Sequence, residues 1–161
     1  MARFEPDPNV TLSVLDRLID DEPHVPTDPP AGRSQSLRRM KVSLRRDLEW
    51  LLNTRRTPDA VQDSSLQLHR SLFNFGLPDI SNLSMQSVSD QNRLLRMMEQ
   101  TISVFEPRVK NARVTLESAG GSARVLRFCI EGLLKLDPAP ERVTFDTVLE
   151  LTNREYEVKG D

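Results

Sequence analysis

An acidic and a basic residue stand on either side of a proline at one point of the sequence. Glu106 and Arg108 flank Pro107 in the stretch ISVFEPRVKNARV, which runs from residue 102 to residue 114. Apolar residues before the proline have helical spacing, and those after it alternate as in a strand. The proline stiffens the backbone and donates no hydrogen bond. Two opposite charges at such a corner either stabilise the corner or form a fixed polar binding site for another molecule.

Other residue types that carry chemistry are sparse and scattered. His24 and His69 lie far apart, and Cys129 is the only cysteine, so no disulfide can form within the chain. A metal site needs several ligands at close spacing, and the sequence has no such cluster. Cys129 falls inside a predicted strand, where we expect a buried and inert thiol. Phosphate-binding and nucleophile motifs are also missing, so we predict no catalytic residue, no cofactor and no metal.

Paired carboxylates need separate consideration, because glycoside hydrolysis requires only two of them. One acid must have its pKa raised in a dry pocket while the second stays ionised. The acids 20–22 crowd a polar stretch that offers no desolvation, and Glu106 has a cation beside it, which favours the ionised form of a carboxyl group. The sequence therefore favours a structural or binding role for Glu106 over that of a general acid.

Charge is balanced over the whole chain but not along it. The net charge is −2, which gives no general attraction to nucleic acid or to an anionic membrane. Residues 1–30 hold seven acids and two arginines, a net of −5, whereas residues 33–56 hold eight bases and two acids, a net of +6. Aromatic platforms for nucleobases are missing around these bases, since Trp50 stands alone there. An acidic protein surface is a better partner, and we predict no nucleic-acid partner.

Hydrophobic spacing predicts helices first and strands second. Helical patterns cover Thr11–Asp20 with Thr11 as N-cap, Ser34–Arg55, Leu66–Phe73 and Val88–Phe105. Strand patterns cover Lys110–Glu117, Ala123–Leu136, Arg142–Leu151 and, as a short fourth strand, Glu155–Val158. We predict an α+β fold with the N-terminal helices packed on one face of a three- to four-stranded antiparallel meander sheet.

Composition and spacing also predict the domain organisation. Residues 1–32 form an acidic N-terminal helix and a proline-rich linker, and residues 33–161 form a single α+β domain. In the long helix 34–55 the apolar stripe predicts burial, while Arg38, Lys41, Arg45 and Arg46 are expected on its exposed surface. Gly76 is expected to supply a left-handed residue in the turn 76–79. With no signal peptide and no membrane-spanning run, we expect a cytoplasmic protein that does not insert into a membrane.

Five fragments occur in the same order as in TssE, the small baseplate subunit of bacterial type VI secretion systems. They are SVLDRLIDDEP, SLRRDLEWLLNTRR, SLFNFGLPDIS, FEPRV and RFCIEGLLKLDPAPERVTFDT. The sequence resembles this family over about residues 11–151. The family is itself similar to the wedge protein of contractile phage tails, which was once labelled lysozyme-like.

The resemblance implies a role in the assembly of a larger complex rather than in catalysis. It implies a cytoplasmic baseplate subunit docked at the inner membrane complex and joined to the TssF and TssG wedge subunits, with TssK as a further candidate partner. It also implies a platform from which the TssB–TssC sheath polymerises. The family's Glu-Pro-Arg motif maps onto Glu106, Pro107 and Arg108, which the resemblance marks as partner-binding residues. The alternative is a lysozyme-like enzyme that cleaves peptidoglycan, although secretion-system members generally lack the catalytic glutamate.

Two further contacts remain open from the sequence. An edge strand can accept a strand from another chain, and the candidate edges are Lys110–Glu117 and Arg142–Leu151. The short N-terminal helix has Leu12, Leu15 and Leu18 on its apolar side. It docks either on its own domain or in a groove of a partner.

Overall fold

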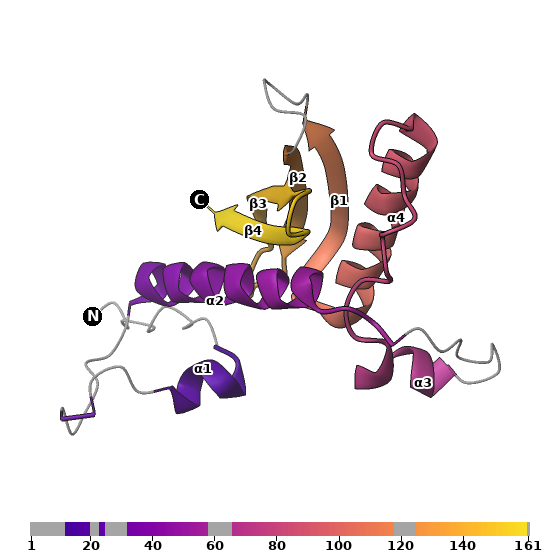
Figure 1. Ribbon diagram of the computed structural model, residues 1–161. Helices are drawn as coiled ribbons and strands as arrows, with labels where there is room; N and C mark the ends of the chain where they lie inside the picture. Colours follow the sequence, from indigo (N-terminus) through magenta and orange to yellow (C-terminus); the bar gives the residue numbers. More distant parts are fainter. Residues whose placement is uncertain (1–11, 20–22, 25–31, 58–65, 118–124, 161) are drawn as a thin grey trace, which may run out of the picture.

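The computed structural model describes residues 12–19, 23–24, 32–57, 66–117 and 125–160. Thr11 and most of the proline-rich linker lie outside this part of the chain. The N-cap predicted at Thr11 is wrong, because the first helix begins after Ser13, which caps it. The helices are α1 Val14–Leu18, α2 Arg33–Asn53, α3 Leu66–His69, the 3-10 helix η1 Leu72–Asn74 and α4 Val88–Phe105 (Figure 1). The strands are β1 Val109–Glu117, β2 Val125–Leu134, β3 Glu141–Glu150 and β4 Glu155–Gly160.

The four strands form one antiparallel sheet in the order β1-β2-β3-β4. The predicted α+β fold is confirmed, with the fourth strand present. One of the two predicted edges is wrong, because β3, which covers most of Arg142–Leu151, pairs with β2 on one side and with β4 on the other. The edges are β1, as predicted from Lys110–Glu117, and the short β4.

The two long helices cover the same face of the sheet, at opposite edges. Helix α2 packs against β4 and α4 packs against β1 (Figure 1). The apolar stripe predicted on α2 is buried at Met40, Leu44, Leu48 and Leu51. Strands β2 and β3 alternate buried and exposed residues, which places one side of the sheet in the core and the other in solvent. The described helices include no apolar stretch of the length that spans a bilayer.

Two of the bases that the sequence places on the exposed surface of α2 are instead engaged in ion pairs. Lys41 Nζ lies 2.9 Å from a carboxylate oxygen of Glu141 at the start of β3. Arg46 Nη2 lies 2.8 Å from Asp16 of α1 and 2.9 Å from Asp47. These bases therefore tie α2 to its neighbours, whereas Arg38 and Arg45 are exposed as predicted.

The turn after η1 has the backbone predicted for it. Gly76 has φ +101°, and a Cβ atom at this position would stand 2.2 Å from the carbonyl oxygen of Thr54. The close approach lets Leu77 exchange backbone hydrogen bonds with the segment that follows α2, through Thr54 and Arg56. Only glycine combines this φ with no side chain, so the loop is fastened to the end of α2 at this residue.

Candidate functional site

The corner between α4 and β1 is built by the last turn of the helix and by Pro107. The backbone N–H of Glu106, the C-cap, donates to the carbonyl of Ile102 at 2.8 Å. Glu106 then accepts from the N–H of Val109, the first residue of β1, at 3.1 Å. Pro107 occupies the turn between them and is exposed. The chain thus changes from helix to strand within three residues, with a fixed backbone.

Glu106 and Arg108 pair with each other across this turn. Arg108 Nε donates to Glu106 Oε1 at 2.7 Å, and Arg108 Nη2 donates to Oε2 at 2.6 Å. Glu106 is only 5 % exposed. The fork geometry fixes the guanidinium plane, and both oxygens of the buried carboxylate are occupied.

The pair belongs to a longer network of alternating charges. Arg108 Nη2 also contacts Asp47 Oδ2 of α2 at 2.6 Å. Asp47 Oδ1 accepts from Arg46, and Arg46 reaches Asp16 Oδ1 of α1 at 2.8 Å. Ser43 Oγ donates to the other Asp16 oxygen at 2.5 Å. The corner, α2 and α1 are therefore joined by one chain of ion pairs.

The charges of this network are stabilised by their neighbours. The hydrogen bond to Glu106 raises the pKa of Arg108, despite desolvation, and Asp47 adds to the effect. Desolvation raises the pKa of Asp16, but the hydrogen bonds from Ser13, Ser43 and Arg46 outweigh it and lower that pKa below its usual value. Both groups are ionised at neutral pH.

The sequence singled out Glu106 and Arg108, but not Asp16, Ser43 and Asp47, which belong to the same network. One signal was available for Asp47, because it is an acid directly beside the apolar stripe of a basic helix, at the margin of the core. Another was the Ser13–Asp16 spacing at a helix start, where Ser13 Oγ accepts from the backbone N–H of Asp16. Neither signal tells which distant arginine completes the network.

The arrangement suits binding better than acid–base chemistry. A general acid needs a carboxyl group that faces its substrate, and both oxygens of Glu106 are held by Arg108. The groups of the corner open to another molecule are Pro107 and the Nη1 side of Arg108, whose side chain is 23 % exposed. Nη1 makes only a long 3.5 Å contact with Ser43. Glu106 is thus placed to orient Arg108 rather than to meet a partner directly.

The two sheet edges differ in how their backbone groups are satisfied. On β4, Asn53 of α2 accepts from the N–H of Tyr156 and donates to its carbonyl, each at 2.8 Å. Glu49 accepts from the N–H of Val158 at 3.2 Å. On β1, Glu99 of α4 accepts from the N–H of Val114 at 2.9 Å. Side chains of α2 therefore bond much of the outward backbone of β4. Among the described residues, the outward backbone of β1 is bonded by a single side chain, that of Glu99, which we call its guard.

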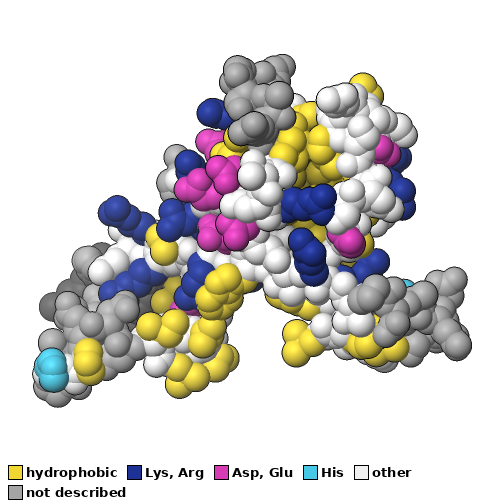
Figure 2. Space-filling view, in the orientation of Figure 1, with side chains coloured by type: hydrophobic (Ala, Val, Ile, Leu, Met, Phe, Trp, Pro, Cys, Tyr) yellow, Lys and Arg dark blue, Asp and Glu magenta, His cyan; other side chains and the backbone are white. Residues whose placement is uncertain are grey.

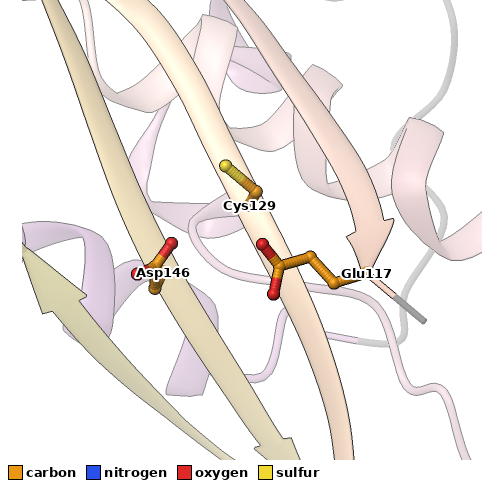
Figure 3. Close-up of side chains that lie close together, drawn as sticks. All are labelled: Glu117, Cys129 and Asp146. Carbon is orange, nitrogen blue, oxygen red and sulfur yellow. The ribbon is translucent and has the colours of Figure 1, made fainter. Parts of the chain in front are cut away.

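A second cluster lies on the sheet face that points away from the helices. Glu117, Cys129 and Asp146, from β1, β2 and β3, place one ligand atom each within 4.8 Å of one another (Figure 3). Cys129 is half-buried rather than buried as predicted. Desolvation raises the pKa of its thiol, and the charges of Glu131, Asp146 and Glu117 add to that rise. The sequence did not group these three residues, because only the pairing of β1, β2 and β3 brings them together, and clusters of exposed acidic groups are common without a metal ion.

Residues 38–139 match the family of baseplate wedge protein gp25. The chain belongs to this family. As a gp25-family protein it is a structural component of a baseplate wedge, and the matched segment includes Arg46, Asp47 and the whole Glu106–Arg108 corner. No individual curated protein and no solved structure matches the chain.

Proposed function

We propose that this gp25-family chain is the TssE-type subunit of a type VI secretion baseplate. In this proposal it joins the TssF and TssG wedge subunits in the cytoplasm, at the inner membrane complex, with TssK as a further candidate partner. It then serves as the platform from which the TssB–TssC sheath polymerises. The family match and the five fragments in TssE order support the proposal.

The observation that carries the wedge contact is the fixed guanidinium at the corner. Arg108 is held by Glu106 and Asp47, so it loses little freedom when a partner docks, and pre-organisation of this kind strengthens binding. Pro107 adds an exposed apolar contact on the same turn. In this scheme Pro107 and Arg108 touch the wedge, and Glu106 is a positioning residue.

Co-purification with TssF and TssG tests the corner. Pro107→Asp is the best variant, because Pro107 is exposed and its side chain lies outside the ion-pair network. A charge that must be desolvated at the contact should reduce wedge affinity by about ten-fold or more, while the Tm should fall no further than it does when a surface proline elsewhere is replaced. Pro140→Asp, at an exposed proline in the β2–β3 turn, is the matched control and should bind as the unaltered chain does. Unchanged wedge binding by Pro107→Asp would refute the corner as the interface.

For the sheath platform, the structure favours β1 over β4 as the strand that accepts a partner strand. The outward backbone groups of Tyr156 on β4 are already bonded to Asn53, whereas on β1 the guard is Glu99, a flexible side chain that an incoming strand can displace. Amide hydrogen exchange of the assembled complex gives a direct test. Val114 and Leu116 should gain protection when sheath subunits add, and Tyr156 should not change. Protection gained on β4 alone would contradict this assignment.

The division of the chain at residue 32 is part of the same proposal. The core lies within residues 33–161, and α1 contributes no buried residue. A chain that begins at residue 33 should therefore fold, at the cost of the contacts of Asp16 with Ser43 and Arg46. Loss of cooperative unfolding in this shorter chain would mean that residues 1–32 belong to the domain.

A further inference from the structure

Helix α1 turns its hydrophobic side chains toward solvent. Val14 and Leu18 are 71 % and 75 % exposed, and Leu15 and Ile19 are each about half exposed. Figure 2 shows hydrophobic side chains gathered over α1, below α2. A helix of five residues has no stability of its own, so something else must hold α1 in place.

What holds α1 is mainly polar. Asp16 is the residue of α1 that points at α2, where it accepts from Ser43 at 2.5 Å and from Arg46 at 2.8 Å. Its side chain is only 10 % exposed. Leu12, just before the helix, adds a partly buried apolar contact with the core. Asp16 thus holds the helix on α2 in an orientation that leaves the apolar side chains outward. We call its contacts with Ser43 and Arg46 the latch.

Helix α2 contributes exposed apolar residues on the same face. Val42, Arg46 and Trp50 follow at intervals of four, so they lie along one side of α2. Val42 and Trp50 are 53 % and 54 % exposed. The guanidinium of Arg46, which holds Asp16, lies 5.1 Å from the centre of the Trp50 ring. Trp50 therefore lies one turn beyond Arg46, with its ring against the guanidinium that pairs with Asp16.

The described charges around this apolar surface are basic. Arg17 of α1 and Arg38 and Arg39 of α2 are exposed. None of these arginines forms an ion pair with another described residue. Among the described residues of this face the one carboxylate is that of Asp16, which is occupied by Ser43 and Arg46. The same ion pairs continue through Asp47 to the corner, so one series of ion pairs links this surface to the corner.

From this geometry we infer that α1 and the outer face of α2 form a second docking surface, for an amphipathic helix of a partner protein with acidic residues flanking its apolar stripe. The apolar side of that helix covers Val14, Leu18 and Trp50, and its carboxylates meet the exposed arginines. Aromatic side chains and arginine are both enriched in protein–protein interfaces, which fits Trp50 and the exposed arginines. The surface is separate from the corner and does not depend on the wedge assignment.

Fluorescence of Trp50, the only tryptophan, reports on this surface in the full chain. The probe is a synthetic amphipathic helix of about 18 residues with leucine along one face and glutamate on both flanks, compared with a peptide that carries lysine instead. We expect the glutamate peptide to shift the emission to shorter wavelength in a saturable way, and the lysine peptide to have no effect. Leu18→Asp should weaken binding by about ten-fold or more. Leu72→Asp, at a leucine of η1 that is 85 % exposed, should not change it.

A further variant tests the latch. Asp16→Asn should also weaken peptide binding, because α1 no longer stays on α2. Equal binding of both peptides, or no emission shift with either, would overturn the inference. So would a shift that depends on the concentration of the chain alone, which would make a second copy the occupant. Tight peptide binding that appears only after residues 1–11 are deleted would make the chain's own N-terminal segment the occupant, against the inference.

Discussion

Arg108 holds the buried carboxylate of Glu106 through two parallel hydrogen bonds, from Nε to Oε1 at 2.7 Å and from Nη2 to Oε2 at 2.6 Å. The same Nη2 reaches Asp47 at 2.6 Å. Glu106 is the C-cap of α4, Arg108 directly precedes β1, and Asp47 lies in α2. The pair therefore ties the corner to the long helix whether or not a partner also uses Arg108.

Removing Arg108 should destabilise the isolated chain. Arg108→Ala leaves Glu106 buried without a partner, and we expect a loss of about 2–3 kcal/mol in the free energy of unfolding by urea. Asp47 keeps Arg46, so its share of the loss is smaller. The double variant Glu106→Met/Arg108→Met should cost less than the sum of the two single Met variants, because no unpaired charge remains. Additive losses would show that the two side chains are not coupled in solution.

Asn53 should protect the β4 edge from unwanted pairing. Asn53→Ala leaves the N–H and the carbonyl of Tyr156 without their partner, and we expect a loss of about 1–2 kcal/mol in unfolding free energy. The opened edge should also raise the rate of aggregation, followed by light scattering. Asn92→Ala, at an exposed position of α4, is the control and should leave both quantities close to those of the unaltered chain. Equal effects of the two variants would mean that β4 needs no cap.

The large elements of this fold are readable from the sequence because local physics decides them. The predicted bounds of α4, Val88–Phe105, agree with the structure, since Ser87 caps its start and Pro107 prevents its continuation. The strand face in the core follows from the alternation of β2 and β3. The edge assignment failed at β3 because β4 covers that side of it. Strand β4 has only six residues and two buried side chains, so its pattern in the sequence is weak, yet its presence decides which strand is the edge.

The candidate site was only partly predictable. Glu106 and Arg108 stand two residues apart, so their pairing is a local matter that the sequence raised as one of two alternatives. Asp47 and Asp16 reach the same network from 61 and 30 positions away along the chain from Arg108 and Arg46 respectively. Such contacts depend on how α2 crosses the corner and on where the linker returns α1, which hydrophobic periodicity does not encode.

Gly76 is the loop position where the backbone conformation should not tolerate substitution by a residue with a side chain. Gly76→Ala combines a φ of +101° with a Cβ that would stand 2.2 Å from the Thr54 carbonyl oxygen. We expect a loss of about 2 kcal/mol or more in unfolding free energy. Gly32→Ala, where a Cβ meets nothing within 4 Å, is the matched control and should cost little. A harmless Gly76→Ala would mean that the loop does not adopt this turn.

Acidification should release α1 before the domain unfolds. The pKa of Asp16 is lowered in the folded chain, so the latch adds stability above the pKa of an unfolded aspartate, about 4, and that stability is lost as pH falls through the lower folded value. NMR signals of α1 should therefore move toward random-coil positions at low pH while those of the sheet stay in place. In Asp16→Asn the α1 signals should be near random coil already at neutral pH. Signals of α1 that do not change with either treatment would argue that Leu12 alone holds the helix.

The hydroxyl group of Tyr156 should add nothing to the free energy of unfolding at neutral pH. The oxygen is buried and has no hydrogen-bond partner among the described residues, and burial raises the pKa of the phenol. Tyr156→Phe should therefore be as stable as the unaltered chain or more stable by about 1 kcal/mol at pH 7. The folded phenol stays protonated, while the unfolded one ionises near pH 10. The free energy of unfolding of the unaltered chain should therefore fall as the pH rises above about 10, and that of Tyr156→Phe should not show this fall. Tyr156 is the only tyrosine, so absorbance at about 295 nm follows its ionisation directly, and tyrosinate that forms near pH 10 in the folded chain would show that the ring is not buried.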